Sequence, residues 1–190
     1  MFTRLILSSH INAKVWWATW RDLQLNRYAF RLVFLFNPIQ LNSYMKKLRS
    51  KEDGLTSMIQ ALKADYSANI ACKSSFISYV FLKRDPIVRF LVTLRVLEYV
   101  FPRRKRVFFR LLSHFLSRNF KRLSYKTGFS IPLFTVAPGV SLPHFGPIII
   151  NPKSSVGAGA RIHVGVNIGG TDNDVPQLGQ NVYLGPGCKL

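Results

Sequence analysis

The sequence predicts an α+β protein in which a helical segment is followed by a parallel β-helix of hexapeptide repeats. Two patterns and a change in composition lead to this prediction. Aliphatic residues recur every six positions after residue 136, whereas the apolar spacing before Gly128 is helical. A period of six fits neither an α-helix nor an alternating strand. It suits a coil in which each hexapeptide forms one side of a triangular turn.

The composition changes near Gly128. The chain has 190 residues and a net charge of +19. Residues 1–128 hold 24 Lys and Arg against 6 Asp and Glu, and residues 129–190 hold 3 against 2. Such an excess favours anionic partners, among them acidic lipid headgroups and phosphorylated cofactors, or it forms a solvated helical surface. No nucleic-acid-binding motif accompanies the charge, so we expect no nucleic-acid partner.

We therefore divide the chain into three parts. Residues 1–44 have no regular period and form an N-terminal extension, with a functional start at Met45 as a hypothesis. Residues 45–128 form a basic α-helical domain, and residues 129–190 form an incomplete β-helix domain. No apolar run is long enough to span a bilayer, and the N-terminus lacks the pattern of a secretory signal. We predict a cytoplasmic protein, with peripheral membrane contact left open.

Three helices are expected before Gly128. The apolar spacing predicts the first from Leu55 to about Leu82. Asp85 followed by Pro86 is a typical helix start, and this second helix should end before Pro102.

The third helix is expected within residues 103–128 and should end at Gly128. Its predicted apolar side consists of Phe108, Leu112, Phe115, Leu116 and Leu123. The side opposite it is predicted to hold Arg103, Arg106, Arg110 and Lys121. A basic amphipathic helix of this kind can lie on a membrane, but we expect it to pack against the other helices.

The hexapeptide count has two interruptions. Two residues are added after Leu142 and four after Ile168, and the count continues on both sides. The aliphatic positions are Val136, Leu142, Ile148, Ile150, Val156, Ile162, Ile168, Leu178, Leu184 and Leu190. We expect these side chains to fill the interior of the coil. The first interruption, "LPHFG", contains His144, and a generic β-sandwich is the alternative to the coil.

The stretch "SIPLFTVAPGVSLPHFGPIIINPKSSVGAGARIHVGVNIGGT", with the later "PQLGQNVYLGPGCKL", resembles the hexapeptide-repeat acyltransferases. Within these it is similar to the serine acetyltransferase family, including its relatives in surface-polysaccharide biosynthesis. The resemblance covers about residues 55–190. It implies a left-handed β-helix, a homotrimer or a dimer of trimers, and acetyl-CoA as cosubstrate in a groove between subunits. It implies no metal, and Cys72 and Cys188 lack metal-ligand spacing.

By this resemblance His144 is the base that takes the proton of an acceptor hydroxyl before the oxygen attacks the thioester. An imidazole, with an ordinary pKa of about 6.5, suits that task near neutral pH. The alternative is a loop histidine with a structural role. His163 is either a second active-site or trimer-interface residue, or a surface residue. The positions that match the CoA groove are Gly170, Thr171, Gly185 and Pro186.

The sequence departs from the family at three places. Pro143 stands where an Asp would precede the base. Asp174 and Val175 replace an Arg-His pair that grips the acceptor, so a sugar hydroxyl stays open beside serine. The chain stops at Leu190 on a core position, and we therefore expect a C-terminally truncated fragment. A non-catalytic, basic, membrane- or complex-associated scaffold is the rival interpretation.

Overall fold

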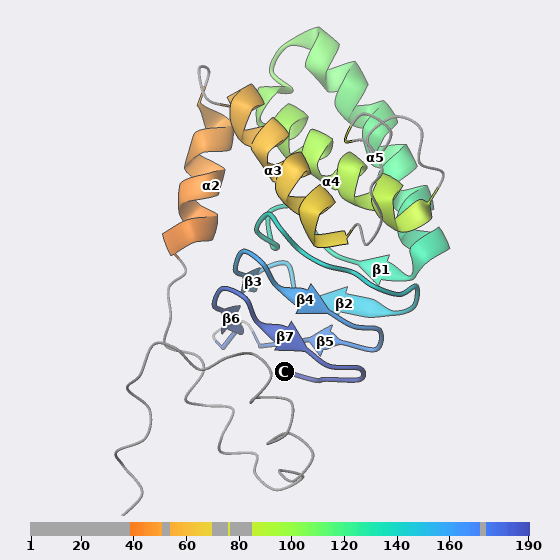
Figure 1. Cartoon of the computed structure of the whole chain (residues 1–190). Helices are drawn as coiled ribbons and strands as arrows, with labels where there is room; N and C mark the ends of the chain where they lie inside the picture. Colours follow the sequence, from red (N-terminus) through yellow and green to blue (C-terminus); the bar gives the residue numbers. More distant parts are fainter. Residues whose placement is uncertain (1–38, 51–53, 70–75, 77–84, 172–173) are drawn as a thin grey trace, which may run out of the picture. The chain divides into compact units, whose positions relative to one another are not determined.

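The computed structural model describes residues 39–50, 54–69, 76, 85–171 and 174–190, and within them helices precede strands (Figure 1). The helices are α2 (Ile39–Arg49), α3 (Gly54–Asn69), α4 (Pro86–Val100), the 3₁₀ helix η3 (Phe101–Arg103) and α5 (Val107–Thr127). The strands are β1 (Phe129–Ser130), β2 (Ile148–Ile150), β3 (Ser155–Val156), β4 (Arg161–Ile162), β5 (Asn167–Ile168), β6 (Gln177–Leu178) and β7 (Tyr183–Leu184). The predicted order, a helical part and then parallel strands, is confirmed.

The strands belong to three parallel sheets that the chain visits in rotation. Strands β2, β3 and β4 lie in three different sheets, and β5, β6 and β7 return to those sheets in the same order. Figure 1 shows the returning strands stacked on the earlier ones. The chain after Gly128 therefore winds as a three-sided coil with short sides.

The pairing register follows the predicted interruptions. Within the repeats, a pairing that spans neither interruption advances 18 residues, one that spans the first advances 20, and one that spans the second advances 22, whereas β1, which precedes the repeats, pairs with β2 at an offset of 19. The respective examples are Ile149 with Asn167, Val136 with Val156 and Arg161 with Tyr183. Both interruptions are thus insertions into a coil that keeps three hexapeptides per turn.

The interior of the coil is filled by the aliphatic series. Nine of its members are at most 8% exposed, and they are Val136, Leu142, Ile148, Ile150, Val156, Ile162, Ile168, Leu178 and Leu184. The expectation that they point inward is confirmed. Leu190 is half-buried. A narrow prism accepts side chains of this size in stacked layers, and burying each contributes about 1.5–3 kcal/mol.

Helix α4 has the predicted boundaries. The Asp85 carboxylate accepts a hydrogen bond of 2.8 Å from the Ile87 N–H, which satisfies an N-terminal amide of α4. Helix α5 ends as predicted at Gly128, whose φ of 84° is accessible because glycine lacks a Cβ atom. Helix α3 ends at Asn69, and apart from Phe76 the predicted extension to Leu82 lies outside the described residues.

Two further expectations concern the extension and the cysteines. Residues 1–38 lie outside the described part of the chain, as does Cys72. Helix α2 begins at Ile39 and continues without a break through Met45.

None of the helices in the described ranges has the length and hydropathy needed to cross a membrane.

The prediction for the packed side of α5 is partly wrong. Leu123 is buried, but Phe108 and Phe115 are 69% and 70% exposed. The packed side is set by α4, because the Phe90 ring stacks on Phe120 at 4.9 Å between ring centroids. That contact turns the helix so that part of its apolar arc faces outward.

Arg103 is not on the outer side of α5 either. It lies in η3, where its guanidinium donates to the carbonyl oxygens of Leu48, Tyr99 and Ser50 at 2.7–2.9 Å. It joins the end of α2 to the end of α4.

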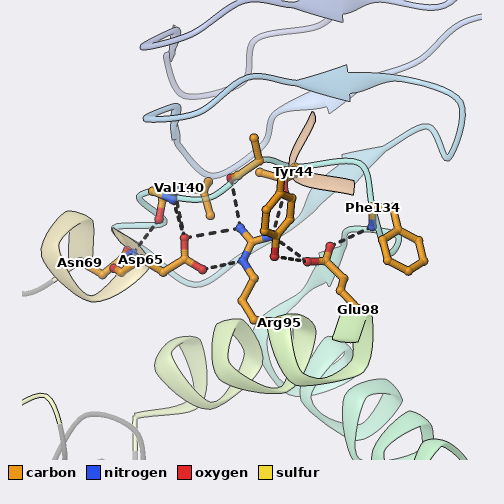
Figure 2. A network of polar contacts seen from close by, with 10 residues as sticks. Tyr44, Asp65, Asn69, Arg95, Glu98, Phe134 and Val140 are labelled. Atoms are coloured by element: carbon orange, nitrogen blue, oxygen red, sulfur yellow. Dashed lines mark hydrogen bonds and ion pairs between the residues drawn. The ribbon is translucent and has the colours of Figure 1, made fainter. Parts of the chain in front are cut away.

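A buried polar network joins the helices to the first turn of the coil (Figure 2). Arg95 of α4 is fully buried, and its five N–H groups all have acceptors. Two contact Asp65, at 2.7 and 3.4 Å, and one contacts Glu98 at 2.9 Å. The other two donate to the carbonyl oxygens of Val136 and Ala137 at 2.8 and 3.1 Å.

The two carboxylates of the network also accept main-chain N–H groups of the same turn. Asp65 accepts from Gly139 and Val140 at 2.7 and 3.2 Å, and Glu98 accepts from Phe134 at 2.9 Å. The charges are therefore paired and hydrogen-bonded, which is the condition for burying them.

The protonation states in the network follow from burial and pairing. Burial opposes the charge of Arg95, but Asp65 and Glu98 more than offset it and hold the pKa of Arg95 well above its usual value. Burial raises the pKa of Glu98, and Arg95 and the Phe134 N–H counteract the rise. Burial also raises the pKa of Tyr44, whose hydroxyl donates to Glu98 at 3.3 Å.

Candidate active site

His144 lies in the first insertion, between the buried residues Leu142 and Ile148, and its side chain is exposed. Two contacts fix the chain on either side of it. The Asn69 side chain of α3 accepts a hydrogen bond of 2.9 Å from the Leu142 N–H, and the Gly146 N–H donates to the Thr127 carbonyl at 2.9 Å. The two extra residues therefore form a bulge that is held by the helical part, with His144 at its outer side.

His163 follows β4 and lies beside His144. Their ring centroids are 5.9 Å apart, and the Tyr183 ring is 5.1 Å from that of His163. The Arg161 Nε donates to Nε2 of His163 at 3.3 Å. The structure thus brings together the two histidines that the sequence singles out, and it adds an arginine and a tyrosine.

The coil register explains why residues far apart in sequence meet here. Ser141 pairs with Arg161, which pairs in turn with Tyr183 on the next turn. The His163 N–H donates to the Leu184 carbonyl at 3.0 Å. His144 and His163 follow the same side of the coil on successive turns, at the corner that leads back to the sheet of β2 and β5 (the histidine corner).

The pKa of His163 is lowered. Partial burial is the first cause, and the positive charge of Arg161 and the neighbouring His144 add to it. A neutral imidazole that accepts from Arg161 carries its proton on Nδ1. His163 is therefore a neutral partner beside His144 near neutral pH.

We expect the Arg161→Gln variant to raise the pKa of His163 toward its usual value, because one of the repelling charges is removed. The sign is fixed, since a nearby cation disfavours the imidazolium form. An NMR titration of the histidine ring signals in the wild type and the variant measures it. A His163 pKa that stays the same or falls in the variant would contradict the assigned contact.

Gly185 and Pro186 lie in the turn after β7, at the histidine corner. On successive turns the Gly165 N–H donates to the Pro147 carbonyl at 2.7 Å and the Gly187 N–H donates to the Val164 carbonyl at 3.0 Å. The segment that contains Gly185 and Pro186 is thus stacked on the segment that follows His163.

Gly170 and Thr171 lie at a different corner, the one after β5. The Thr171 N–H donates to the Asp174 carbonyl at 3.1 Å, which closes the turn. Together with Asn151, Pro152 and Lys153, these two residues line an open cavity of about 460 Å³ (the glycine corner). The structure does not bring Gly170 and Thr171 together with the histidines of the same chain.

Some residues of these two corners were not identified from the sequence. The repeat spacing alone predicts the position of Tyr183. One turn of three hexapeptides plus the four residues of the second insertion is 22 residues, which places Tyr183 directly next to Arg161 on the following turn. Asn151 and Lys153 carry no motif of their own and are identified by the cavity. Arg161 is identified by its contact with His163.

The two histidines of the histidine corner have no carboxylate partner within the described ranges. Within the described ranges, no hydrogen bond or ion pair joins a carboxylate to either histidine. Within the same ranges, no group of three or more His, Cys, Asp or Glu side chains is placed to hold a metal ion. The titratable groups that the structure gathers here are two imidazoles, a guanidinium and a phenol.

The fold is that of a helical segment followed by a three-sided parallel coil, and three solved structures similar to it are serine acetyltransferases. The enzyme of Neisseria gonorrhoeae in complex with serine is 20% identical, with a TM-score of 0.47, over 78% of this chain and 66% of that one. The enzyme of Brucella abortus strain S19 is 20% identical, with a TM-score of 0.48, over 93% and 78%. Serine acetyltransferase 1 of Entamoeba histolytica in complex with L-cysteine is 13% identical, with a TM-score of 0.44, over 79% and 63%.

No protein-family model matches the sequence, and no curated protein matches it. The chain spans between about three fifths and four fifths of the length of the solved structures named above. At these identities and TM-scores the activity of the matched enzymes does not transfer to this chain.

Proposed function

We propose that this protein is an acetyl-CoA-dependent O-acetyltransferase, of the serine acetyltransferase type, in which His144 is the general base. One observation carries the proposal. An exposed histidine stands on a bulge that the coil interior and the helices hold in place, next to a second histidine whose pKa is lowered. An acceptor hydroxyl can reach such a base from solvent.

The proposed reaction is a direct transfer. His144 takes the proton of the acceptor hydroxyl while that oxygen bonds to the thioester carbonyl carbon. The carbon–sulfur bond then breaks, and CoA leaves with the sulfur, which takes up a proton. The main-chain N–H of Gly185 is a suitable donor to the oxyanion that forms on the thioester carbonyl, since Pro186 has no N–H and the N–H groups of Gly187 and Cys188 donate within the coil.

We propose that the coil is left-handed and that the protein is a homotrimer, alone or as a dimer of trimers, and the positions of the two corners support an assembly of subunits. The histidines with Gly185 and Pro186 are at one corner, and Gly170 and Thr171 are at another. One CoA molecule contacts both sets if the histidine corner of one subunit faces the glycine corner of its neighbour. Lys153 at the glycine corner adds a cation for the CoA phosphates.

Serine is the first acceptor to consider. Arg161 contacts His163 at the histidine corner, and a guanidinium there suits the carboxylate of an amino acid.

A sugar hydroxyl is the second candidate. The exposed Asp174 at the turn of Gly170 and Thr171 favours an uncharged acceptor over an anionic one at the glycine corner.

The test is an assay of thiol release from acetyl-CoA with L-serine, or with free and nucleotide-linked sugars, as acceptor. We expect turnover with serine, and a raised KM for serine in the Arg161→Gln variant because the carboxylate loses its cation. Turnover with a sugar that is insensitive to Arg161→Gln would assign the saccharide acceptor instead. No thiol release with any of these acceptors, combined with no binding of CoA, would favour the non-catalytic scaffold.

A further inference from the structure

The outward side of α5 exposes large apolar residues. Val107, Leu111 and Phe115 follow one another at intervals of four, and Phe108 lies beside them. These four side chains are between 66% and 70% exposed. They are the apolar part of what we call the outer face of α5. Four large apolar side chains on one helix side form a contiguous patch, which is unlike the scattered single residues of an ordinary surface.

Basic residues surround this patch. They are exposed, and they comprise residues 104–106 just before α5 and Arg110, Arg118, Lys121, Arg122 and Lys126 within it. The first turn of α5 has no acidic residue, and the side chain of its N-cap residue Arg106 makes no capping hydrogen bond. Cations at a helix N-terminus are unfavourable, so this arrangement lowers the stability of the isolated helix.

No acidic residue in the described helical part of the chain offsets these charges. The sequence from residue 99 to 171 contains no Asp or Glu. Asp65 and Glu98 are fully buried with Arg95, and Asp85 accepts from the first turn of α4. Because Asp65 and Glu98 are buried with Arg95, their negative charges are not exposed beside α5, and the surface of α5 is strongly cationic.

We propose that the outer face of α5 binds the surface of a membrane that contains anionic phospholipids. The helix would lie in the plane of the interface. Phe108, Leu111 and Phe115 would enter the boundary between headgroups and acyl chains, while the arginines and lysines contact lipid phosphates. This inference goes beyond the transferase reaction and does not depend on it.

Charge selects the membrane among the candidate occupants. A second copy of this face would bring the same cations into contact, and like charges repel. Residues 1–38 hold five basic residues against one acid, so they offer no complementary charge either. Nucleic acid would match the charge, but a duplex backbone gives no apolar environment for four exposed apolar side chains.

The test is vesicle sedimentation of the full chain, with phosphatidylcholine alone and with equal parts of phosphatidylcholine and phosphatidylglycerol. We expect binding to the mixed vesicles only, and weaker binding as salt is added. The double variant Arg118→Gln/Arg122→Gln should bind about 30-fold more weakly, since each basic residue near the surface strengthens partition about fivefold. The variant Phe108→Ser/Phe115→Ser should bind at least about tenfold more weakly.

Matched controls are Leu55→Ser, an exposed leucine of α3, and Lys46→Gln/Lys47→Gln, two exposed lysines of α2. Both should bind like the wild type, and all variants should melt at the wild-type temperature because the substituted side chains are exposed. Four results would overturn the proposal. They are equal binding to neutral vesicles, wild-type binding by the α5 variants, an equal loss in a control variant, and binding to duplex DNA or to a second copy without binding to anionic vesicles.

Discussion

Replacing His144 with alanine should lower kcat/KM for acetyl transfer by about 10²–10⁴-fold, which is what a positioned general base typically contributes. The fold should be unaffected, because the side chain is exposed and makes no hydrogen bond within the described part of the chain. The affinity for CoA should also stay unchanged, since the proposed CoA contacts come from other residues. Steady-state thiol release, together with calorimetric titration of CoA, separates these two effects.

The control for this variant is His114→Ala. His114 is an exposed histidine of α5, and nothing places it near the reacting atoms. Its replacement should leave kcat/KM unchanged in an assay without lipid. If His144→Ala retained activity within a factor of about three of the control, the general-base assignment would have to be given up.

The Arg95→Met variant should lower the free energy of unfolding by about 3–5 kcal/mol. Methionine fills much of the volume, but it leaves Asp65 and Glu98 as unpaired carboxylates in a buried site. It also leaves the carbonyl groups of Val136 and Ala137 without donors. Urea unfolding followed by circular dichroism measures the loss.

Arg89→Met on the same helix is the matched control. Arg89 is exposed, and replacing it should change the stability by no more than about 0.5 kcal/mol. Adding Glu98→Gln to Arg95→Met should recover part of the loss, because one of the unpaired charges is removed. A loss in Arg95→Met no larger than in Arg89→Met would show that the network contributes little to stability.

The coil could be predicted from sequence because its rule is local. An aliphatic residue at every sixth position has only one way to be buried, and an insertion shifts the count without destroying it. The register of 18, 20 and 22 residues follows directly from the spacing between interruptions. The placement of Tyr183 beside His163 is a consequence of that register.

The buried network could not be predicted in the same way. Arg95 and Glu98 stand out as charges within the apolar run "IVRFLVTLRVLEYVF", which indicates that they are special. Their main-chain partners are far away in sequence, however. Val136 and Ala137 are 41 and 42 residues beyond Arg95, in a segment whose own pattern gives no sign of an arginine.

The orientation of α5 was missed for a related reason. Its apolar residues cover a wide arc of the helix, and only part of that arc can be buried. Which part is buried depends on the Phe90 ring of α4 and therefore on a contact between two helices. Periodicity within α5 alone does not contain that information.

The network has a consequence for how the protein can be divided. Between residues 134 and 142, seven main-chain groups bond to side chains from α3 and α4. If the chain were cut at residue 128, these groups would lose their partners, at a cost of about 1–3 kcal/mol for each one that stays buried. The helices thus serve as the end cap that every stacked array of repeats requires. The β-coil is not a module that can be transplanted without them.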